Sequence, residues 1–148
     1  MSRAAALPFE ATLRVRDCCL GLHIQRAARA LARRFDVALR PVGLTNGQFS
    51  LLMSLNRPDP PAMAPVAALL AMDRTTLTAA LKPLERRGLV RIQPDPADRR
   101  SRLLHLTPAG RCLLSSALPI WEQTHAQIES ELPSGDPGRL RADLRALS

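Results

Sequence analysis

The chain has 148 residues, which is enough for one domain with a buried core, and neither an internal repeat nor a low-complexity linker divides it. Its 21 Lys and Arg residues exceed its 13 Asp and Glu residues, and this formal net charge of +8 favours a polyanionic partner such as nucleic acid. No apolar run reaches the roughly 18 residues of a membrane helix, and the N-terminus lacks the apolar segment of a signal peptide, so we expect a cytoplasmic protein without a membrane partner.

The charge alone does not decide the partner. Every basic residue except Lys82 is arginine, in a chain rich in Ala, Leu and Pro, and coding from a GC-rich genome also gives such a composition. The arrangement of the charges along predicted elements must therefore supply the argument.

Residues 12–40 show one long helical pattern. Apolar side chains recur on one face of it, at Leu13, Leu20, Ile24, Ala27, Leu31 and Ala38. A helix of this length would expose its apolar stripe on a small monomer, whereas a second copy of the chain would cover it. The pattern favours a homodimer, with packing inside the same chain as the alternative.

Two adjacent cysteines, Cys18 and Cys19, lie in this helical pattern. Neighbouring helical side chains point roughly 100° apart, so a disulfide to a second subunit or to Cys112 is easier to form than one between them. We regard Cys18 and Cys19 as candidate redox residues, with inert thiols as the alternative. Cys19 and His23 have the spacing of a ligand pair, but no second pair follows, so we expect no metal and no other cofactor.

Turn residues at Pro41 and Gly43 end the first helix, and Thr45 is a suitable cap for a helix over 46–56. The turn-forming sequence NRPDPP then ends the helical pattern. After it, we expect residues 62–63 to add a short third strand to a small sheet. Pro65 suits the first turn of a short helix that covers residues 66–71.

Residues 72–87 predict an amphipathic helix that begins at the capping residue Asp73 and ends before Gly88. Its apolar arc contains Leu77, Ala80, Leu81 and Leu84. The opposite arc contains our candidates for contacts in the major groove of DNA, which are Arg74, Thr75, Thr78 and Lys82. Pro83 should bend the helix near its end, away from these residues.

Residues 89–93 and 102–107 are short β-compatible runs, separated by PDPADRRS. They predict a hairpin whose tip carries Arg99 and Arg100, with Asp98 close enough to pair with one of them. An arginine on such a basic tip can reach a minor groove while the preceding helix lies in the adjacent major groove.

A further helix should start at Pro108 and run towards Leu132, with a kink at Pro119. The sequence PSGDPG ends it, and a last helix covers residues 139–147. We expect these helices to interleave with the first helix of a partner subunit.

The motifs of the central region resemble the winged helix-turn-helix core of the multiple antibiotic resistance regulator (MarR) family. They are D-R-T-T-L-T at 73–78, L-x-x-L-E-R-R-G-L-V at 81–90 and D-x-x-D-R-R-S-R-x-x-x-L-T-P-A-G at 95–110, and the strong match extends over 62–111. The resemblance implies a mainly α fold with a small antiparallel β-ribbon, and a homodimer that binds pseudo-palindromic double-stranded DNA and usually represses transcription. It also implies release of the DNA by a small-molecule effector of unknown identity or by an oxidant.

The resemblance also implies roles for single residues and regions. Arg100 would enter the minor groove, because it lies two positions after Asp98, the aspartate of the wing, which would orient it. Residues 1–148 would form a single domain, with dimerisation helices in 1–42 and 108–148 and a DNA-binding lobe in 43–107. In peroxide sensors of the family, tyrosines hold a reactive cysteine near the start of the first helix. This chain contains no tyrosine.

Other classes of protein fit less well. The sequence lacks a Gly-rich phosphate loop, a G-x-S-x-G elbow and a metal-ligand cluster, so we do not expect an enzyme. Three alternatives to a sequence-specific regulator stay open: a winged-helix module that binds protein, a module that binds DNA without sequence preference, and a thiol-based redox sensor.

Overall fold

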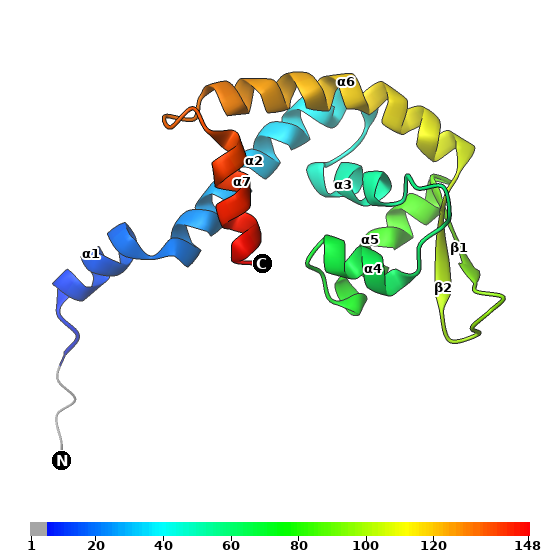
Figure 1. Ribbon diagram of the computed structural model, residues 1–148, viewed down its shortest axis with the longest axis horizontal. Coiled ribbons are helices and arrows are strands. Elements are labelled where there is room, and N and C mark those ends of the chain that lie inside the picture. The colour runs from blue at the N-terminus through cyan, green and yellow to red at the C-terminus, as the bar shows by residue number, and fades with distance from the viewer. Residues whose placement is uncertain (1–5) are drawn as a thin grey trace, which may run out of the picture.

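The computed structural model describes residues 6–148, so residues 1–5 of the predicted dimerisation region lie outside the description. The described part is mainly helical with one two-stranded antiparallel sheet, as expected (Figure 1). In chain order its elements are α1 (Phe9–Cys18), α2 (Leu20–Leu39), the 3-10 helix η1 (Arg40–Val42), α3 (Asn46–Ser54), α4 (Met63–Leu69), α5 (Arg74–Arg86), β1 (Val90–Pro94), β2 (Arg102–Leu106), α6 (Pro108–Ser130) and α7 (Pro137–Ala146).

The predicted first helix over residues 12–40 is wrong in one respect, because the chain forms two helices there. Cys19 has an extended backbone (φ −73°, ψ 107°) that ends α1 and precedes α2. Its sulfur accepts a hydrogen bond from the Leu22 amide at 3.5 Å and so caps α2. No residue of α1 is buried, so no packing within the chain holds α1 in line with α2.

The core lies between α3, α4, α5 and the ribbon, and extends to α2 and α6. Leucine dominates it because α3 and α5 each turn an apolar arc towards the same centre, as the periodicity of α5 predicted. The largest fully buried side chains are Leu39, Leu51, Leu52, Leu77, Leu81, Leu84, Leu104 and Val66. This core fixes the orientation of α5 relative to the ribbon.

The long helices α2 and α6 pack side by side and curve over residues 43–107 (Figure 1). We call this pair of helices the arch and residues 43–107 the lobe. Trp121 of α6 stacks with Phe35 of α2 and with Phe49 of α3, with ring centroids 6.3 and 6.0 Å away. Arg34, the residue before Phe35 in α2, donates two hydrogen bonds to the carboxylate of Glu131 at the end of α6, at 2.5 and 2.7 Å. This bidentate contact lowers the pKa of Glu131 and raises that of Arg34. The stack and the ion pair therefore both join α2 to α6.

The ribbon pairs Val90 with Leu106 and Pro94 with Arg102. The expected third strand at residues 62–63 is reduced to one bridge between Ala62 and Leu103, because Met63 already begins α4. The short helix therefore covers Met63–Leu69 rather than 66–71, and Pro65 lies in its first turn, as predicted. Helix α6 continues through Pro119 without a break and appears as an arc in Figure 1.

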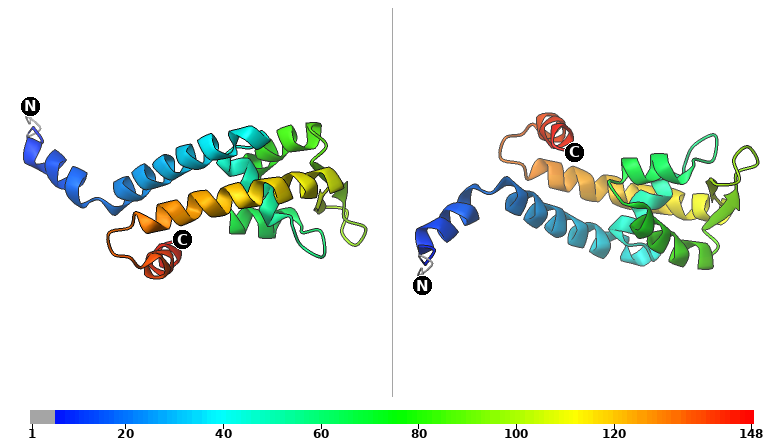
Figure 2. Two further views of the ribbon diagram at one scale, coloured as in Figure 1. Left: turned by 90° about the horizontal axis from the view of Figure 1, so that it is seen from above. Right: turned by 90° about the horizontal axis from the view of Figure 1, so that it is seen from below.

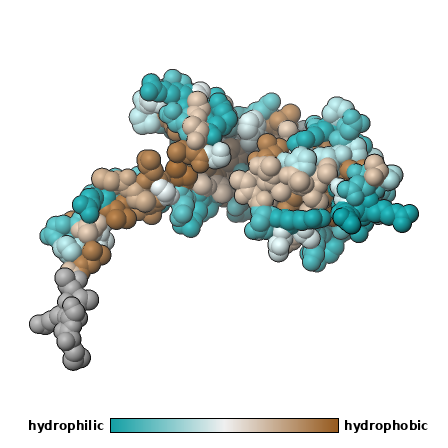
Figure 3. Space-filling model, turned by 60° about the horizontal axis from the view of Figure 1, so that its bottom comes forward, coloured by the Kyte–Doolittle hydropathy of each residue, from teal (hydrophilic) through white to brown (hydrophobic). Residues whose placement is uncertain are grey.

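A large apolar surface lies at the end of the molecule away from the lobe. Leu20 of α2 is 69% exposed, and Leu147, next to the end of α7, is 65% exposed. Other exposed apolar side chains nearby are Phe9, Val15, Ile24, Leu31, Leu140 and Leu144. Figure 3 shows brown, apolar atoms along this part of the chain. Within residues 6–148 no helix is both long and apolar enough to span a bilayer.

Candidate nucleic-acid interface

The start of α5 is fixed by the cap that the sequence predicted. Asp73 Oδ1 accepts a hydrogen bond from the Thr76 amide at 2.7 Å, and the hydrogen bonds from Thr76 hold the pKa of Asp73 below its ordinary value. The first helical residue is then Arg74, whose side chain is exposed. The cap therefore places an arginine at the outer end of the helix.

The polar arc of α5 faces solvent, as expected, with Arg74, Thr75, Thr78 and Lys82 all exposed. The hydroxyl of Thr78 donates to the Arg74 carbonyl oxygen at 2.8 Å. Its proton is thus used within the helix, while the oxygen can still accept a hydrogen bond and the methyl group can contact an apolar surface. Pro83 lies inside the helix, beyond these four residues.

The tip of the ribbon is a hydrogen-bonded loop. The Asp95 amide donates to the Ser101 carbonyl oxygen at 3.0 Å, and Asp98 Oδ1 accepts from the backbone amide of Arg100 at 3.0 Å. The expected pairing of Asp98 with a tip arginine side chain is therefore wrong, since the ion pairs of residues 6–148 do not include Asp98. The carboxylate fixes the backbone of Arg100 instead, because a turn of this kind satisfies a free amide.

A hollow of about 390 Å³ joins the start of α5 to the base of the ribbon tip. We call it the helix–ribbon hollow; its polar lining comes from Arg74, Asp98, Arg100, Ser101 and Arg102, and its apolar lining from Ala62, Met63, Ala64 and Ala67. The structure thus brings together three of the predicted residues, Arg74, Asp98 and Arg100. Arg99, Thr75, Thr78 and Lys82 do not line it.

Arg102 also lines this hollow, although it was not among the candidate DNA-binding residues. Strand alternation was the available signal, because Arg102 lies on the same ribbon face as the buried residue Leu104. That face is the inner one, towards α4 and α5. The hollow therefore contains three guanidinium groups and one carboxylate.

Contacts outside the predicted site hold the far end of α5. Arg87 Nη1 donates to the Gly43 carbonyl oxygen at 2.9 Å, which ties the end of α5 to the turn after η1. The Thr107 hydroxyl donates to the Gly88 carbonyl oxygen at 2.7 Å and accepts from the Gly110 amide at 3.0 Å. These residues connect the candidate interface to α6.

The candidate redox residues lie at the junction of α1 and α2, with Cys18 exposed and Cys19 partly exposed. The predicted alternative of a bond to Cys112 within one chain is wrong, because α1 and the start of α6 lie at opposite ends of the molecule in both views of Figure 2. His23 Nδ1 lies 2.8 Å from the carbonyl oxygen of Cys19. Among the described residues no three potential ligands gather into a metal site.

Comparison with known proteins identifies this architecture. The sequence profile of the MarR family matches residues 44–101. The HTH-type transcriptional repressor NicR of Pseudomonas putida is 32% identical over 93 residues, which are 63% of this chain and 59% of NicR. The chain thus spans about three-fifths of the length of that repressor.

Solved structures match over most of the chain. The transcriptional regulator MosR of M. tuberculosis, in complex with DNA, is 40% identical with a TM-score of 0.80, and the match covers 87% of this chain and 92% of MosR. CouR of Rhodococcus jostii RHA1, bound to p-coumaroyl-CoA, is 26% identical with a TM-score of 0.76, covering 88% and 92%.

The winged-helix fold is therefore confirmed, and so is the prediction of a regulator rather than an enzyme, since the relatives are DNA-binding regulators. The chain belongs to the MarR family of DNA-binding transcriptional regulators.

Proposed function

We propose that the protein is a repressor that binds pseudo-palindromic operator DNA as a homodimer and releases it when a small ligand or an oxidant acts. In this proposal residues 43–107 are the DNA-binding lobe, and residues 1–42 and 108–148 supply the dimerisation helices. NicR is named a repressor, and this supports the direction of regulation.

The helix–ribbon hollow is the observation that supports DNA binding most directly. Arg74 at the start of α5 and Arg100 at the ribbon tip face one space, although they are distant in sequence. We assign Arg74, Thr75, Thr78 and Lys82 to the major groove, Arg100 to the minor groove and Arg99 to the adjacent phosphates. Phosphate contacts position the lobe, and the helix contacts read base edges.

The apolar surface supports the homodimer. α1 buries no residue in its own chain, and neither does α7. Exposed apolar side chains on these helices and on α2 gather in one part of the molecule, where their contact with water is unfavourable. A second copy in two-fold symmetry would cover it and would present two α5 helices to two half-sites of one DNA.

The junction between the arch and the lobe is our candidate for effector action. Phe35, Phe49 and Trp121 connect α2, α3 and α6 there, and His125 stacks on Trp121 with ring centroids 4.6 Å apart. α2 and α6 also border a groove of about 480 Å³ that includes Arg33 and Thr124. A ligand that favours one arrangement of the arch would change the spacing of the two α5 helices.

Oxidation is a second candidate trigger. The break between α1 and α2 falls at Cys18 and Cys19, so a covalent change there would act at a junction of the dimerisation region. The exposed thiol of Cys18 is accessible to an oxidant or to a second chain.

Selection from random duplex DNA tests the proposal. We expect enrichment of a palindromic sequence, bound far more tightly than a scrambled duplex and with a steep salt dependence. A variant with Arg74→Ala, Lys82→Ala and Arg100→Ala should lose this preference. Absence of any enriched sequence would favour a nonspecific DNA-binding module, and retained binding of another protein by the triple variant would favour a protein-binding module.

A further inference from the structure

A second pocket, of about 380 Å³, lies on the outer face of the ribbon. Its basic lining comes from four segments: Arg57 from the loop between α3 and α4, Arg91 from β1, His105 from β2 and Arg111 from α6. We call it the arginine pocket. Three guanidinium groups from distant parts of the sequence border this single space.

Strand alternation separates the arginine pocket from the helix–ribbon hollow. Arg91 pairs with His105 in the ladder, so both side chains point to the same face, and the neighbouring pair Val90 and Leu106 is buried on the other. The Arg91–His105 pair also lies three residues, or about 10 Å, further from the tip than the strand end that carries Arg102. The two basic sites therefore lie on opposite faces and at different heights of the ribbon.

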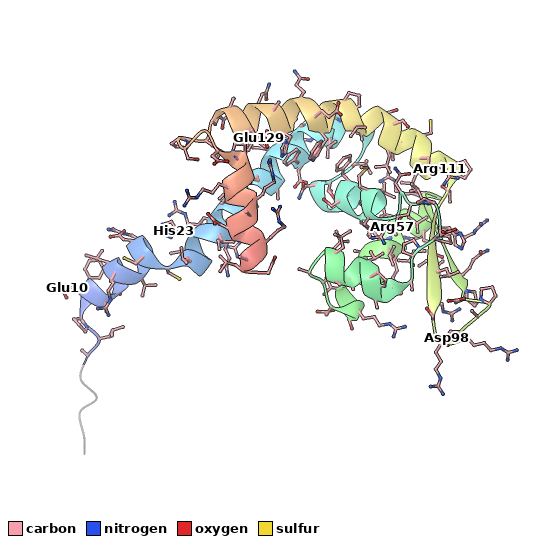
Figure 4. The ribbon with its side chains drawn as sticks, in the orientation of Figure 1. Glu10, His23, Arg57, Asp98, Arg111 and Glu129 are labelled. Atoms are coloured by element: carbon pink, nitrogen blue, oxygen red, sulfur yellow. The ribbon has the colours of Figure 1, made fainter. Side chains whose placement is uncertain are left out.

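Figure 4 shows the difference in height between the two sites. Arg111 lies at the end of the ribbon opposite to the tip that carries Asp98. The proposed base and minor-groove contacts involve the tip and α5, so they do not require the arginine pocket.

The described residues place little negative charge at the arginine pocket: Asp59, between the lining residues Pro58 and Pro60, is not itself part of the lining. None of its lining residues is acidic, and the ion pairs of residues 6–148 do not include Arg57, Arg91 or Arg111. Thr107 and Pro108 add the start of α6, a long helix with no acidic residue in its first turn, to the wall. The partial positive charge of a helix start adds to that of the arginines. An anion would relieve the repulsion between these groups.

Two of the arginines are held in place by the backbone. Arg57 Nε donates to the Ser54 carbonyl oxygen at 3.0 Å, and Arg111 Nη1 donates to the Leu106 carbonyl oxygen at 2.9 Å. Each guanidinium has five N–H donors, so each keeps several for a ligand. A planar fork of donors fits the oxygens of a phosphate group, and anchoring reduces the conformational entropy that binding removes.

We propose that the arginine pocket binds a phosphate group, with Arg57, Arg91 and Arg111 as its donors. The phosphate comes either from a small phosphorylated molecule or from the backbone of DNA that extends beyond the operator. This site goes beyond the proposed function, because it needs neither the helix–ribbon hollow nor the apolar surface.

Binding of a free phosphate is tested without DNA. Inorganic phosphate is titrated into the full chain, with ionic strength kept constant by sodium chloride, and the backbone N–H signals of His105 and Thr107 in the pocket wall are followed by NMR. We expect saturable shifts that disappear in the triple variant Arg57→Gln, Arg91→Gln and Arg111→Gln. The matched control is Arg14→Gln, Arg26→Gln and Arg29→Gln, which removes three exposed arginines from α1 and α2 and should keep the shifts. Thermal unfolding of both variants checks that they fold.

A second experiment tests whether the bound phosphate belongs to DNA. It measures the affinity of the protein for the selected operator in two forms, a minimal duplex and a duplex with longer flanks. If the pocket holds a backbone phosphate, the pocket variant has a lower affinity only for the longer duplex, and its salt slope falls by about 0.9 for each phosphate that it no longer neutralises. If it holds a free ligand, the pocket variant and the control bind both duplexes equally, and phosphate alone gives the shifts. The proposal is overturned when phosphate gives no saturable shift and the pocket variant matches the control on both duplexes. If the selection enriches no operator, the DNA experiment cannot be made and the proposed function is contradicted. The phosphate titration still tests whether the arginine pocket binds phosphate.

Discussion

Gly110 lies against the carbonyl group of Leu89, so close that a Cβ atom at position 110 would be 2.3 Å from the Leu89 oxygen and 2.7 Å from Leu106 Cδ1. The start of α6 thus packs directly on the backbone that follows α5. Thr107 strengthens the same junction, since its hydroxyl donates to the Gly88 carbonyl oxygen. The candidate DNA-binding helix and the arch meet at this point, and only glycine fits there.

Replacement of Gly110 should therefore destabilise the protein. Gly110→Ala forces either α6 or the Leu89 carbonyl to shift, which we expect to cost about 1–3 kcal/mol in the free energy of unfolding. The measurement is chemical denaturation at neutral pH. Gly47→Ala is the control, because Gly47 lies in α3 with nothing within 4 Å of an added Cβ atom, and it should stabilise the chain by about 0.5–1 kcal/mol. Equal stability of the two variants would contradict the close packing at Gly110.

The cap of α5 should make stability depend on pH in acid. Hydrogen bonds from Thr76 lower the pKa of Asp73 below its ordinary value of 3.8 in the folded state. The charged carboxylate therefore contributes stability that is fully present above pH 3.8 and is lost as pH falls through the folded pKa.

The test compares the wild type with Asp73→Asn by thermal unfolding between neutral pH and pH 3. Asn also caps helices but does not titrate, so the wild type should be more stable at neutral pH and should lose this advantage in acid. Asp59→Asn removes the same charge from the loop after α3, away from any helix start. A difference between wild type and Asp73→Asn that does not change with pH would exclude the cap as its cause.

The sequence predicted the elements with local signals and missed those set by tertiary contacts. The predicted caps at Thr45 and Asp73 both form, because each depends on residues within one turn. The break at Cys19 was not predicted, since the apolar periodicity continues across it. Nothing local indicated that α1 would lack a packing partner.

The same division applies to the candidate interface: its local features could be predicted from the sequence, and its tertiary arrangement could not. The polar arc of α5 and the basic tip follow from periodicity and turn residues. That Arg74 and Arg102 line one hollow depends on how α4 and the ribbon pack. The arginine pocket was not predicted, because its basic residues come from four segments that are far apart in the sequence. The residues around Arg57 carry no local signal of a binding site.

The apolar surface predicts a change in oligomeric state. Leu20→Glu places a charge on the exposed stripe of α2, so it should shift the protein from dimer to monomer in analytical ultracentrifugation. Leu69→Glu is the control, because Leu69 of α4 has a similar exposure, 61% against 69%, but belongs to the lobe. A dimer that survives Leu20→Glu at micromolar concentration would argue against this surface as the interface.

Peroxide treatment should link two chains if the cysteines respond to oxidants. Cys18 is exposed at the end of α1, so we expect a dimer on non-reducing gels that disappears on addition of a reductant. Cys18→Ser should abolish the link, whereas Cys112→Ser should not, because Cys112 lies at the far end of the molecule in α6. Unchanged DNA affinity after peroxide treatment would mean that the thiols do not control the regulator.

Arg100 and Arg99 provide the sharpest test of the DNA contacts, because they are adjacent and carry the same charge. Arg100 lines the helix–ribbon hollow with Arg74, and Arg99 does not. We therefore expect Arg100→Ala to lower affinity for the selected DNA by about tenfold, or about 1.4 kcal/mol, and Arg99→Ala to lower it less. The measurement is fluorescence anisotropy at two salt concentrations. Equal reductions for the two variants would mean that the tip acts through its charge alone, whereas a reduction specific to Arg100 would require the position that the hollow gives it.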